Sequence, residues 1–167
     1  MNKTIAVCPG SFDPVTVGHI DIIERAAQMF SKVVVVVMKN SAKQPCFSAE
    51  ERAEMLRQSV KGKGNIEVDI YDGLLAEYSK KIGACAIVKG LRAMSDFEYE
   101  FQMALTNKKL NPCTETVFLT TKAENMYLSS SMVKQIGSMG GDISDFVPKE
   151  IHKIIIDRLN NINRAVD

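Results

Sequence analysis

One stretch decides the fold of this chain: Pro9-Gly10-Ser11-Phe12-Asp13-Pro14-Val15-Thr16-Val17-Gly18-His19. It joins a strand-like run, Thr4–Cys8, to a helix-like run that begins at Gly18. A loop rich in Gly, Pro and hydroxyl side chains between a first strand and a first helix is where α/β folds bind phosphate groups. The start of a helix adds free backbone N–H groups and the positive end of the helix dipole. A histidine at this point can face a phosphoryl group, so the stretch indicates chemistry on a nucleotide.

Strand-like and helix-like runs alternate along the rest of the chain. Strands are expected at Thr4–Cys8, Lys32–Met38, Ile66–Tyr71, Ala84–Val88 and Thr116–Leu119. Helices are expected at Gly18–Phe30, Ala49–Val60, Leu74–Ile82, Asp96–Leu110, Ser130–Ser138 and Pro148–Asn160. The run Val33–Val37 is apolar on both faces, as in a parallel strand covered on both sides. We therefore predict an α/β fold over residues 1–167, a single doubly wound domain with a five-stranded parallel Rossmann-like sheet and helices on both faces.

Side chains suited to binding phosphate follow several of these strands. Ligands of such sheets bind beyond the carboxyl ends of the strands, at the point where the strand order reverses. The loops at that edge carry a histidine, three cations and two helix starts: His19, Lys43, Lys89, Arg92, Gly18 and Ser130. We therefore expect one anion-binding site, built from loops that are far apart in the sequence.

These residues favour phosphoryl or nucleotidyl transfer, which depends on positioning and charge neutralisation more than on covalent catalysis. A donor or a cation at the α-phosphate stabilises the charge that develops in the transition state. An attacking phosphate group, whose second pKa is about 6, is already ionised near neutral pH. Such a reaction needs no general base, and no histidine–carboxylate pair is evident in the sequence.

Other classes of site are disfavoured by motifs that the sequence lacks. The P-loop pattern, the H-E-x-x-H pattern and a G-x-G-x-x-G fingerprint after the first strand do not occur. The four cysteines are scattered without a C-x-x-C pair, which argues against a zinc site or a disulfide framework and favours a cytoplasmic protein with reduced thiols. Cys8 and Cys85 are expected in the core. A net charge of +1 gives no general attraction to nucleic acid or membranes, and we expect neither a signal peptide nor a membrane span.

In these motifs the chain resembles the phosphopantetheine adenylyltransferases, a family of the nucleotidyltransferase superfamily that shares a T/H-x-G-H signature. The signature here is Thr16-Val17-Gly18-His19. The resemblance continues, beyond Lys43, through Phe47-Ser48-x-x-Glu51-Arg52, Gly90-Leu91-Arg92-Ala93-x-x-Asp96-Phe97-Glu98-Tyr99-Glu100 and Leu128-Ser129-Ser130-Ser131. It covers nearly the whole chain in order, and its GLRA-x-x-DFEYE segment is more specific than the signature.

The resemblance implies transfer of AMP from ATP to 4′-phosphopantetheine, giving dephospho-coenzyme A and pyrophosphate with Mg²⁺, in coenzyme A biosynthesis. It also implies a homo-oligomer, a homohexamer in its usual assembly. His19 would stabilise the transition state. ATP would be bound by Ser11, Phe12, His19, Gly90, Leu91, Arg92, Glu100, Asn125, Met126, Tyr127, Leu128, Ser129, Ser130 and Ser131. Phosphopantetheine would be bound by Ser11, Lys43, Leu75 and Lys89. No protein ligand to the metal is expected, since substrate and water would hold it.

Three other functions are weighed against this one. A nucleotidyltransferase acting on nicotinamide mononucleotide or glycerol phosphate would share the histidine signature, but the apolar Leu74-Leu75 pair and the GLRA-x-x-DFEYE segment favour phosphopantetheine. A class I aminoacyl-tRNA synthetase needs a longer chain and a tRNA-binding surface. A nucleotide-binding regulator would be marked by loss of His19 or a loop cation, and all are present.

Overall fold

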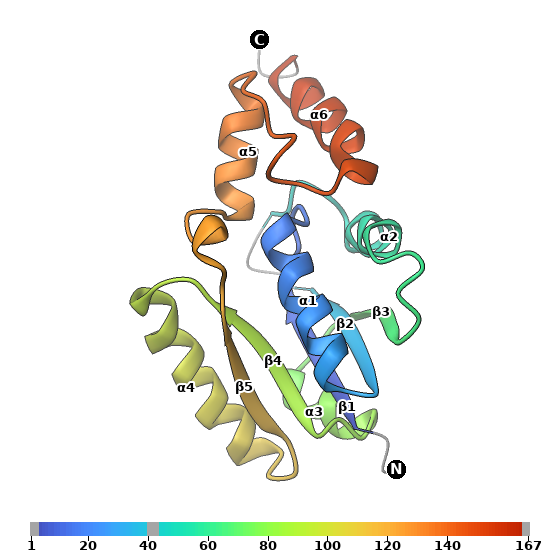
Figure 1. Ribbon diagram of the computed structural model, residues 1–167, viewed down its shortest axis with the longest axis vertical. Helices are drawn as coiled ribbons and strands as arrows, with labels where there is room; N and C mark the ends of the chain where they lie inside the picture. Colours follow the sequence, from blue (N-terminus) through green and yellow to red (C-terminus); the bar gives the residue numbers. More distant parts are fainter. Residues whose placement is uncertain (1–3, 40–43, 165–167) are drawn as a thin grey trace.

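The computed structural model describes residues 4–39 and 44–164, and Lys43 lies outside this part of the chain. The strands are β1 (Ile5–Gly10), β2 (Lys32–Met38), β3 (Ile66–Tyr71), β4 (Ala86–Leu91) and β5 (Glu115–Thr120). The helices are α1 (Val17–Met29), α2 (Ala49–Ser59), α3 (Leu75–Lys81), α4 (Met94–Leu110), the 3₁₀ turn η1 (Ala123–Asn125), α5 (Ser130–Ser138) and α6 (Lys149–Arg164). All the predicted strands and α-helices are present, with ends shifted by a few residues (Figure 1).

The strands form one parallel sheet in the order β3-β2-β1-β4-β5. The chain moves outward from β1 to β3 and then returns to place β4 on the other side of β1. The strand order therefore reverses between β1 and β4, which is where doubly wound sheets bind their ligands. The predicted fold class is confirmed.

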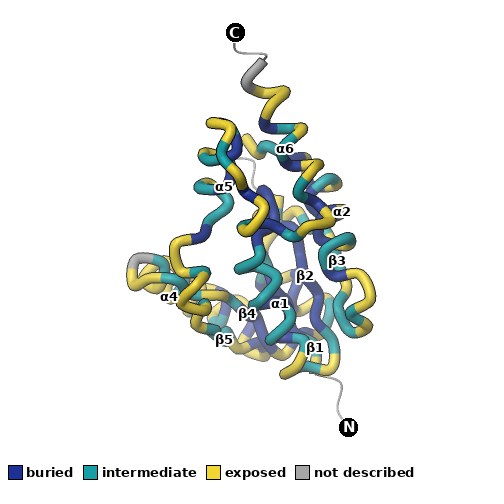
Figure 2. The backbone as a smooth tube through the Cα atoms, turned by 45° about the horizontal axis from the view of Figure 1, so that its top comes forward, coloured by how far each residue is buried: buried dark blue, intermediate teal, exposed yellow. Residues whose placement is uncertain are grey.

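Helices cover both faces of the sheet because alternate strand residues bury apolar side chains on opposite sides. On one face Val33, Val35 and Val37 of β2 belong to the core that α1 and α2 complete. On the other face Val34 and Val36 pack in a second cluster that includes Tyr78 and Leu75 of α3. The helix α4 also contacts β4, β5 and α3. Figure 2 shows the buried backbone concentrated in the central strands.

The last two helices pack beyond the carboxyl ends of the strands. They contact each other, and α6 also contacts α2 (Figure 1). The contact between them is close at Gly137, where an added Cβ would lie 2.5 Å from Leu159 Cδ1. This pair of helices brings the start of α5 to the edge where β1 and β4 end.

Two strands run further than the sequence predicts. The pairing of β1 with β2 continues to Pro9 and Gly10, and the pairing of β4 with β5 continues through Lys89, Gly90 and Leu91, which were expected in a loop. Between β1 and β4, however, pairing is restricted to Ala6 with Ala86 and Val7 with Ile87. Pro9 has no N–H to give to a strand on that side. The two strands therefore separate toward their carboxyl ends and leave space between them.

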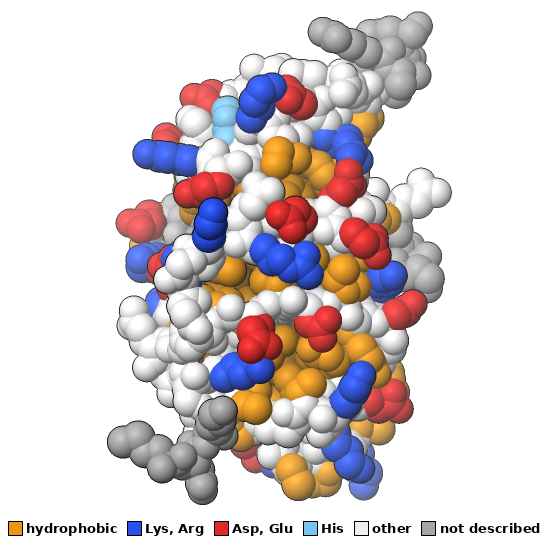
Figure 3. Space-filling view, turned by 90° about the vertical axis from the view of Figure 1, so that its right-hand side faces the viewer, with side chains coloured by type: hydrophobic (Ala, Val, Ile, Leu, Met, Phe, Trp, Pro, Cys, Tyr) orange, Lys and Arg blue, Asp and Glu red, His pale blue; other side chains and the backbone are white. Residues whose placement is uncertain are grey.

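The surface mixes both signs of charge. On the face shown in Figure 3, acidic and basic side chains are interspersed with apolar ones. Cys8 is buried as predicted, but Cys85 is exposed because it lies just before β4 rather than within it. Within residues 4–39 and 44–164, no helix has both the length and the apolar character needed to cross a bilayer.

Candidate active site

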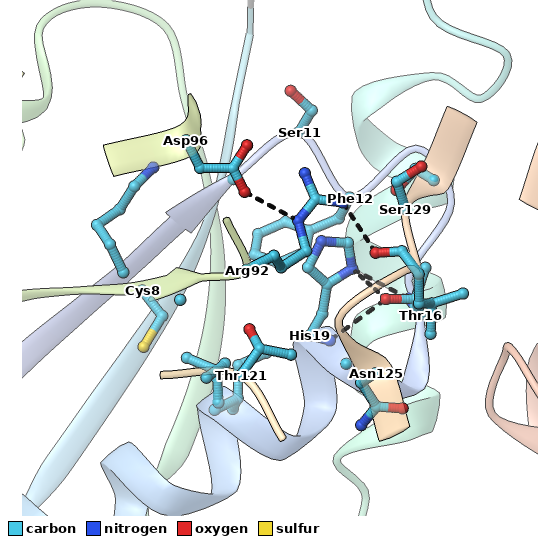
Figure 4. A pocket seen from close by; sticks show the side chains of 18 of the residues that line it. Cys8, Ser11, Phe12, Thr16, His19, Arg92, Asp96, Thr121, Asn125 and Ser129 are labelled. Carbon is cyan, nitrogen blue, oxygen red and sulfur yellow. Dashed lines mark hydrogen bonds and ion pairs between the residues drawn. The ribbon is translucent and has the colours of Figure 1, made fainter. Parts of the chain in front are cut away.

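A cleft of about 590 Å³ opens where β1 and β4 separate. Its walls come from the loop after β1, the start of α1, the end of β4, the first turns of α4 and the start of α5. Figure 4 shows His19 and Arg92 close together in this cleft, with Thr16 and Ser129 beside them. Residues from Cys8 to Ser131 thus meet in one site at the predicted edge of the sheet.

The loop after β1 holds a strained backbone that brings an aromatic ring against the histidine. Phe12 has a φ of 51°, in the left-handed region that disfavours residues with a side chain. Its ring is buried and meets the ring of His19 edge to face, with the centroids 5.1 Å apart. A Cβ at Gly10 would lie 2.8 Å from Phe12 Cζ, so glycine is required there for this ring position. The loop therefore fixes one side of the histidine.

Helix α1 begins with a capping box that fixes the other side of His19. Thr16 is the N-cap, and its Oγ1 accepts from the backbone N–H of His19 at 3.3 Å. In return, His19 Nδ1 accepts from the backbone N–H of Thr16 at 3.1 Å. A backbone N–H can only donate, so Nδ1 must carry a lone pair and the proton of the neutral ring is on Nε2. The imidazole therefore presents an N–H donor from its other nitrogen.

The charge state of His19 follows from its surroundings. Burial lowers the pKa of this imidazole to about 4, and the nearby charges of Arg92 and Lys89 act in the same direction. The ring is neutral at physiological pH and donates from Nε2 without being a cation. Another cleft residue, Cys8, has its pKa raised to about 12 by burial, and Lys89 only partly offsets this. Its thiol is therefore protonated and inert as a nucleophile.

Two cations at the end of β4 are oriented by carboxylates of α4. Lys89 Nζ lies 3.0 Å from Glu100 Oε1, and Arg92 Nε lies 3.2 Å from Asp96 Oδ2. Arg92 Nη1 also donates to the carbonyl of Leu128 at 2.8 Å. These contacts use part of the five N–H donors of the guanidinium. The cleft consequently has positive groups that are positioned before any anion arrives.

The start of α5 supplies a further anion-binding feature. Ser129 is its N-cap and accepts from the backbone N–H of Met132 at 3.1 Å. Ser130 Oγ donates to the carbonyl of Pro14 at 2.7 Å, which joins this helix to the loop after β1. Ser129, Ser130 and Ser131 all line the cleft. The first N–H groups of a helix attract anions, so this end of the cleft suits a phosphate or a polar part of a nucleotide.

Most of the predicted site residues meet in the cleft. Those that line it are Ser11, Phe12, His19, Lys89, Gly90, Arg92, Glu100, Asn125, Leu128, Ser129, Ser130 and Ser131. Four others do not line it: Leu91, Met126, Tyr127 and Leu75. Met126 and Tyr127 are exposed, and the Tyr127 ring packs against Phe146 instead. Leu75 packs in the cluster on the α3 face. Lys43 is outside the described residues.

Some cleft residues were not assigned a role from the sequence. Thr16 appeared only as part of the signature, although its position three residues before His19 is the spacing of a capping box. Asp96 appeared only within the GLRA-x-x-DFEYE segment, although its position four residues after Arg92 is the spacing of an ion pair on a helix. Tyr99 and Thr121 also line the cleft, and no local pattern in the sequence indicates this.

The carboxylates of the cleft do not form a metal-binding group. Asp96 and Glu100 each pair with a cation. Among the residues that the structure describes, no group of three or more His, Cys, Asp or Glu is placed to hold a metal ion. This set of donors suits a metal that arrives on a phosphate chain and is held by phosphate oxygens and water.

The chain is similar over most of its length to several known proteins. The cytidylyltransferase-like family matches residues 7–136. A phosphopantetheine adenylyltransferase from Caldanaerobacter subterraneus is 56% identical over 154 residues, which are 92% of this chain and 96% of that protein. The corresponding protein of Clostridium tetani is 54% identical over 157 residues, 94% of this chain and 98% of the other.

The chain belongs to the phosphopantetheine adenylyltransferase family. It is therefore an enzyme, a nucleotidyltransferase of coenzyme A biosynthesis that transfers an adenylyl group from ATP to 4′-phosphopantetheine. The function predicted from the sequence is confirmed. A nicotinic acid mononucleotide adenylyltransferase from Plasmodium falciparum, solved with NaAD, has the same fold with a TM-score of 0.69. The alignment covers 97% of each chain at 16% identity. This chain and that enzyme therefore share the doubly wound fold.

Proposed function

We propose that the cleft carries out AMP transfer by direct in-line attack. A phosphate oxygen of 4′-phosphopantetheine forms a bond to the α-phosphorus of ATP, the bond from that phosphorus to the bridging oxygen breaks, and pyrophosphate leaves. The attacking phosphate, with a second pKa of about 6, is ionised at neutral pH and needs no general base. The observation that carries this proposal is the neutral His19, whose Nδ1 accepts from the Thr16 N–H, in a cleft with two cations.

His19 is the transition-state stabiliser in this mechanism. Its Nε2–H would donate to an oxygen of the α-phosphate, where negative charge accumulates as the two P–O bonds change. Because the ring is fixed by Thr16 and Phe12, the donor is oriented before the reaction begins. Such preorganised donors avoid the cost of reorientation during the chemical step.

ATP would lie between the end of β4 and the start of α5. Arg92 would bind its phosphates, while the first N–H groups of α5 and the serines around them would hold the rest of the nucleotide. The other proposed ATP contacts are Ser11, Phe12, Gly90, Leu91, Glu100, Asn125, Met126, Tyr127 and Leu128. Gly90 lets Ile22 of α1 pack against the end of β4, since a Cβ there would lie 2.9 Å from Ile22 Cγ1.

The phosphate of phosphopantetheine would be bound by Ser11, Lys43 and Lys89. Lys89 currently pairs with Glu100, so the incoming phosphate would compete with that carboxylate for the ammonium group. Leu75 would contact the apolar arm of the substrate. The neighbouring Leu74 is 53% exposed. The arm would then run out of the cleft toward α3.

Mg²⁺ is proposed to enter with ATP as part of the substrate. The phosphate oxygens and water would hold it, because the cleft carboxylates are engaged with cations. When bound, it would neutralise charge on the phosphate chain and on the leaving pyrophosphate.

A homo-oligomer in the cytoplasm, with residues 1–167 acting as one domain, completes the proposal. Its support is α4, a helix of 17 residues on which Asn107 is the one buried residue among the side chains that the structure describes. The same helix carries seven exposed apolar side chains, Met94, Phe97, Tyr99, Phe101, Met103, Leu105 and Leu110. A surface of this extent is typical of an interface between subunits. The homohexamer expected from the sequence would bury it.

The experiment that tests the reaction measures pyrophosphate release from ATP and Mg²⁺ with three acceptors in separate tubes. The acceptors are 4′-phosphopantetheine, nicotinamide mononucleotide and glycerol 3-phosphate. Release with 4′-phosphopantetheine alone is expected. Release with another acceptor would contradict the proposed specificity, and no release in any tube would contradict the reaction.

A further inference from the structure

The carboxylate of Asp13 has a set of contacts that the reaction itself does not explain. Its side chain is buried, with 7% of the residue exposed. Oδ1 accepts from the backbone N–H of Phe47 at 2.9 Å, and Oδ2 accepts from that of Cys46 at 3.0 Å. Oδ2 also accepts from Lys134 Nζ of α5 at 2.8 Å. One carboxylate therefore joins the loop after β1, the segment before α2, and the helix whose start lines the cleft.

A second buried side chain closes the same connection. Arg52 of α2 is 5% exposed, and its Nη1 donates to the carbonyl of Ser11 at 2.6 Å. Its Nε donates to the carbonyls of Phe47 and Ser48 at 3.0 and 3.2 Å. The backbone on both sides of Phe12 is thus held, by Arg52 on one side and by Asp13 on the other. Phe12 itself is the residue with positive φ whose ring touches His19.

We propose that Asp13, with its partner Lys134, is a positioning residue for the adenylyl transfer: it fixes the strained loop that sets Phe12 against His19, and it links this loop to α5. The inference rests on the proposed function, because it assumes that His19 is the donor in the transition state. Asp13 would not touch either substrate. It would act by keeping His19 in register with the start of α5, and a displacement of the order of 1 Å at such a site costs about 100-fold in rate.

The chemistry of the contacts explains why a carboxylate is needed here. Both oxygens of Asp13 face N–H donors. An asparagine has the same shape but one acceptor, and its NH₂ group would face a donor whichever way the amide is turned. Asp13→Asn therefore breaks at least one of these contacts without changing the volume of the side chain. An unpaired buried donor is costly, so the loop would shift to reach another partner.

The experiment measures kcat and both KM values for Asp13→Asn by pyrophosphate release, at a temperature where circular dichroism shows the variant folded. The matched control is Glu24→Gln, which removes an ion pair between α1 and Lys63 away from the cleft. We expect Asp13→Asn to lower kcat about 10- to 100-fold, with a KM for ATP within about 2-fold of the wild type. The control should keep the wild-type kcat.

A structural role alone is separated from positioning by combining Asp13→Asn with His19→Ala. If Asp13 acts through His19, the Asp13→Asn substitution should lower kcat less than about 3-fold in the His19→Ala background. The reason is that the effects of residues acting as a unit are not additive. An equal loss in both backgrounds would overturn the inference, and so would a wild-type kcat for Asp13→Asn. An inactive wild-type enzyme would instead contradict the proposed function.

A second pair of variants keeps the test decisive if Asp13→Asn does not fold. Lys134 is partly exposed, so Lys134→Met should be tolerated. It removes the ammonium and leaves Asp13 with its two backbone donors. We expect kcat to fall several-fold for Lys134→Met and to recover in Lys134→Arg, which restores the charge. A wild-type kcat for Lys134→Met, or an equal loss in both variants, would overturn the link to α5.

Discussion

At the scale of single residues, His19 is both the N3 residue of a helix and the proposed catalytic donor. Nδ1 of this ring completes the capping box and must therefore be unprotonated. The capping interaction thus determines that Nε2 is the nitrogen that carries the proton and faces the cleft. Burial and the two nearby cations keep the ring neutral. A neutral donor is useful beside Arg92 and Lys89, since a third cation would repel them.

Removing the imidazole should reduce the rate without changing the fold. For His19→Ala we expect kcat to fall about 10²- to 10³-fold, the cost of one lost transition-state donor. The KM for ATP should change little, because Arg92 and the start of α5 remain. Pyrophosphate release gives the rate and circular dichroism gives the fold. Near-normal turnover would remove His19 from its role.

The capping hydroxyl of Thr16 should matter both for stability and for the rate. Thr16→Val keeps the shape but removes the Oγ1 acceptor for the His19 N–H. The loss of such a cap costs about 1 kcal/mol of unfolding free energy, and looser orientation of the ring should lower kcat several-fold. Thr16→Ser is the control that keeps the hydroxyl. Urea unfolding and pyrophosphate release measure the two effects, and equal behaviour of both variants would contradict this role.

At the scale of the elements, the separation of β1 from β4 creates the cleft, and α4 contributes to it from one side. The first turns of α4 supply Asp96 and Glu100, which orient the two cations. Several apolar side chains further along α4 are exposed, with Leu105 57% exposed. Figure 2 shows how little of α4 is buried. A subunit contact along α4 would therefore also hold the carboxylates of the site.

A charge on this surface should break the oligomer. We expect Leu105→Glu to lower the molar mass in solution, because an interface cannot bury an unpaired carboxylate without a large cost. Met139→Glu is the control, since Met139 is also exposed but lies at the end of α5. Light scattering measures the mass of both variants. An unchanged mass for Leu105→Glu, or a monomeric wild type, would contradict the proposed interface.

At the scale of the whole molecule, buried titratable groups link stability to pH. The folded pKa of His19 is about 4, and that of an unfolded histidine is about 6.5. Between these values the unfolded chain binds more protons, so stability falls as the pH drops through this window. Burial raises the pKa of Asp13, but hydrogen bonds from Lys134, Cys46 and Phe47 outweigh it and keep that pKa below its usual value. The stabilisation by Asp13 is therefore lost only at still lower pH.

Urea unfolding at about pH 7 and about pH 4.5 tests this dependence. The wild type should lose stability between the two values, by at most about 1.4 kcal/mol per pH unit from His19. His19→Gln, which does not titrate, should lose less over the same range. Parallel losses in the two proteins would show that His19 is not the source.

The sequence by itself determined the order of strands and helices, the parallel sheet and the loop after the first strand that lines the cleft. These features depend on local patterns, such as the apolar run Val33–Val37, which the structure confirms as a buried strand. Only the tertiary structure decided that β4 continues through Lys89, that Arg92 pairs with Asp96 and that Asp13 meets Lys134, 121 residues away. The physical reason is that hydrophobic periodicity acts between near neighbours in the chain. Strand separation, burial and ion pairing depend instead on groups that only the folded chain brings together.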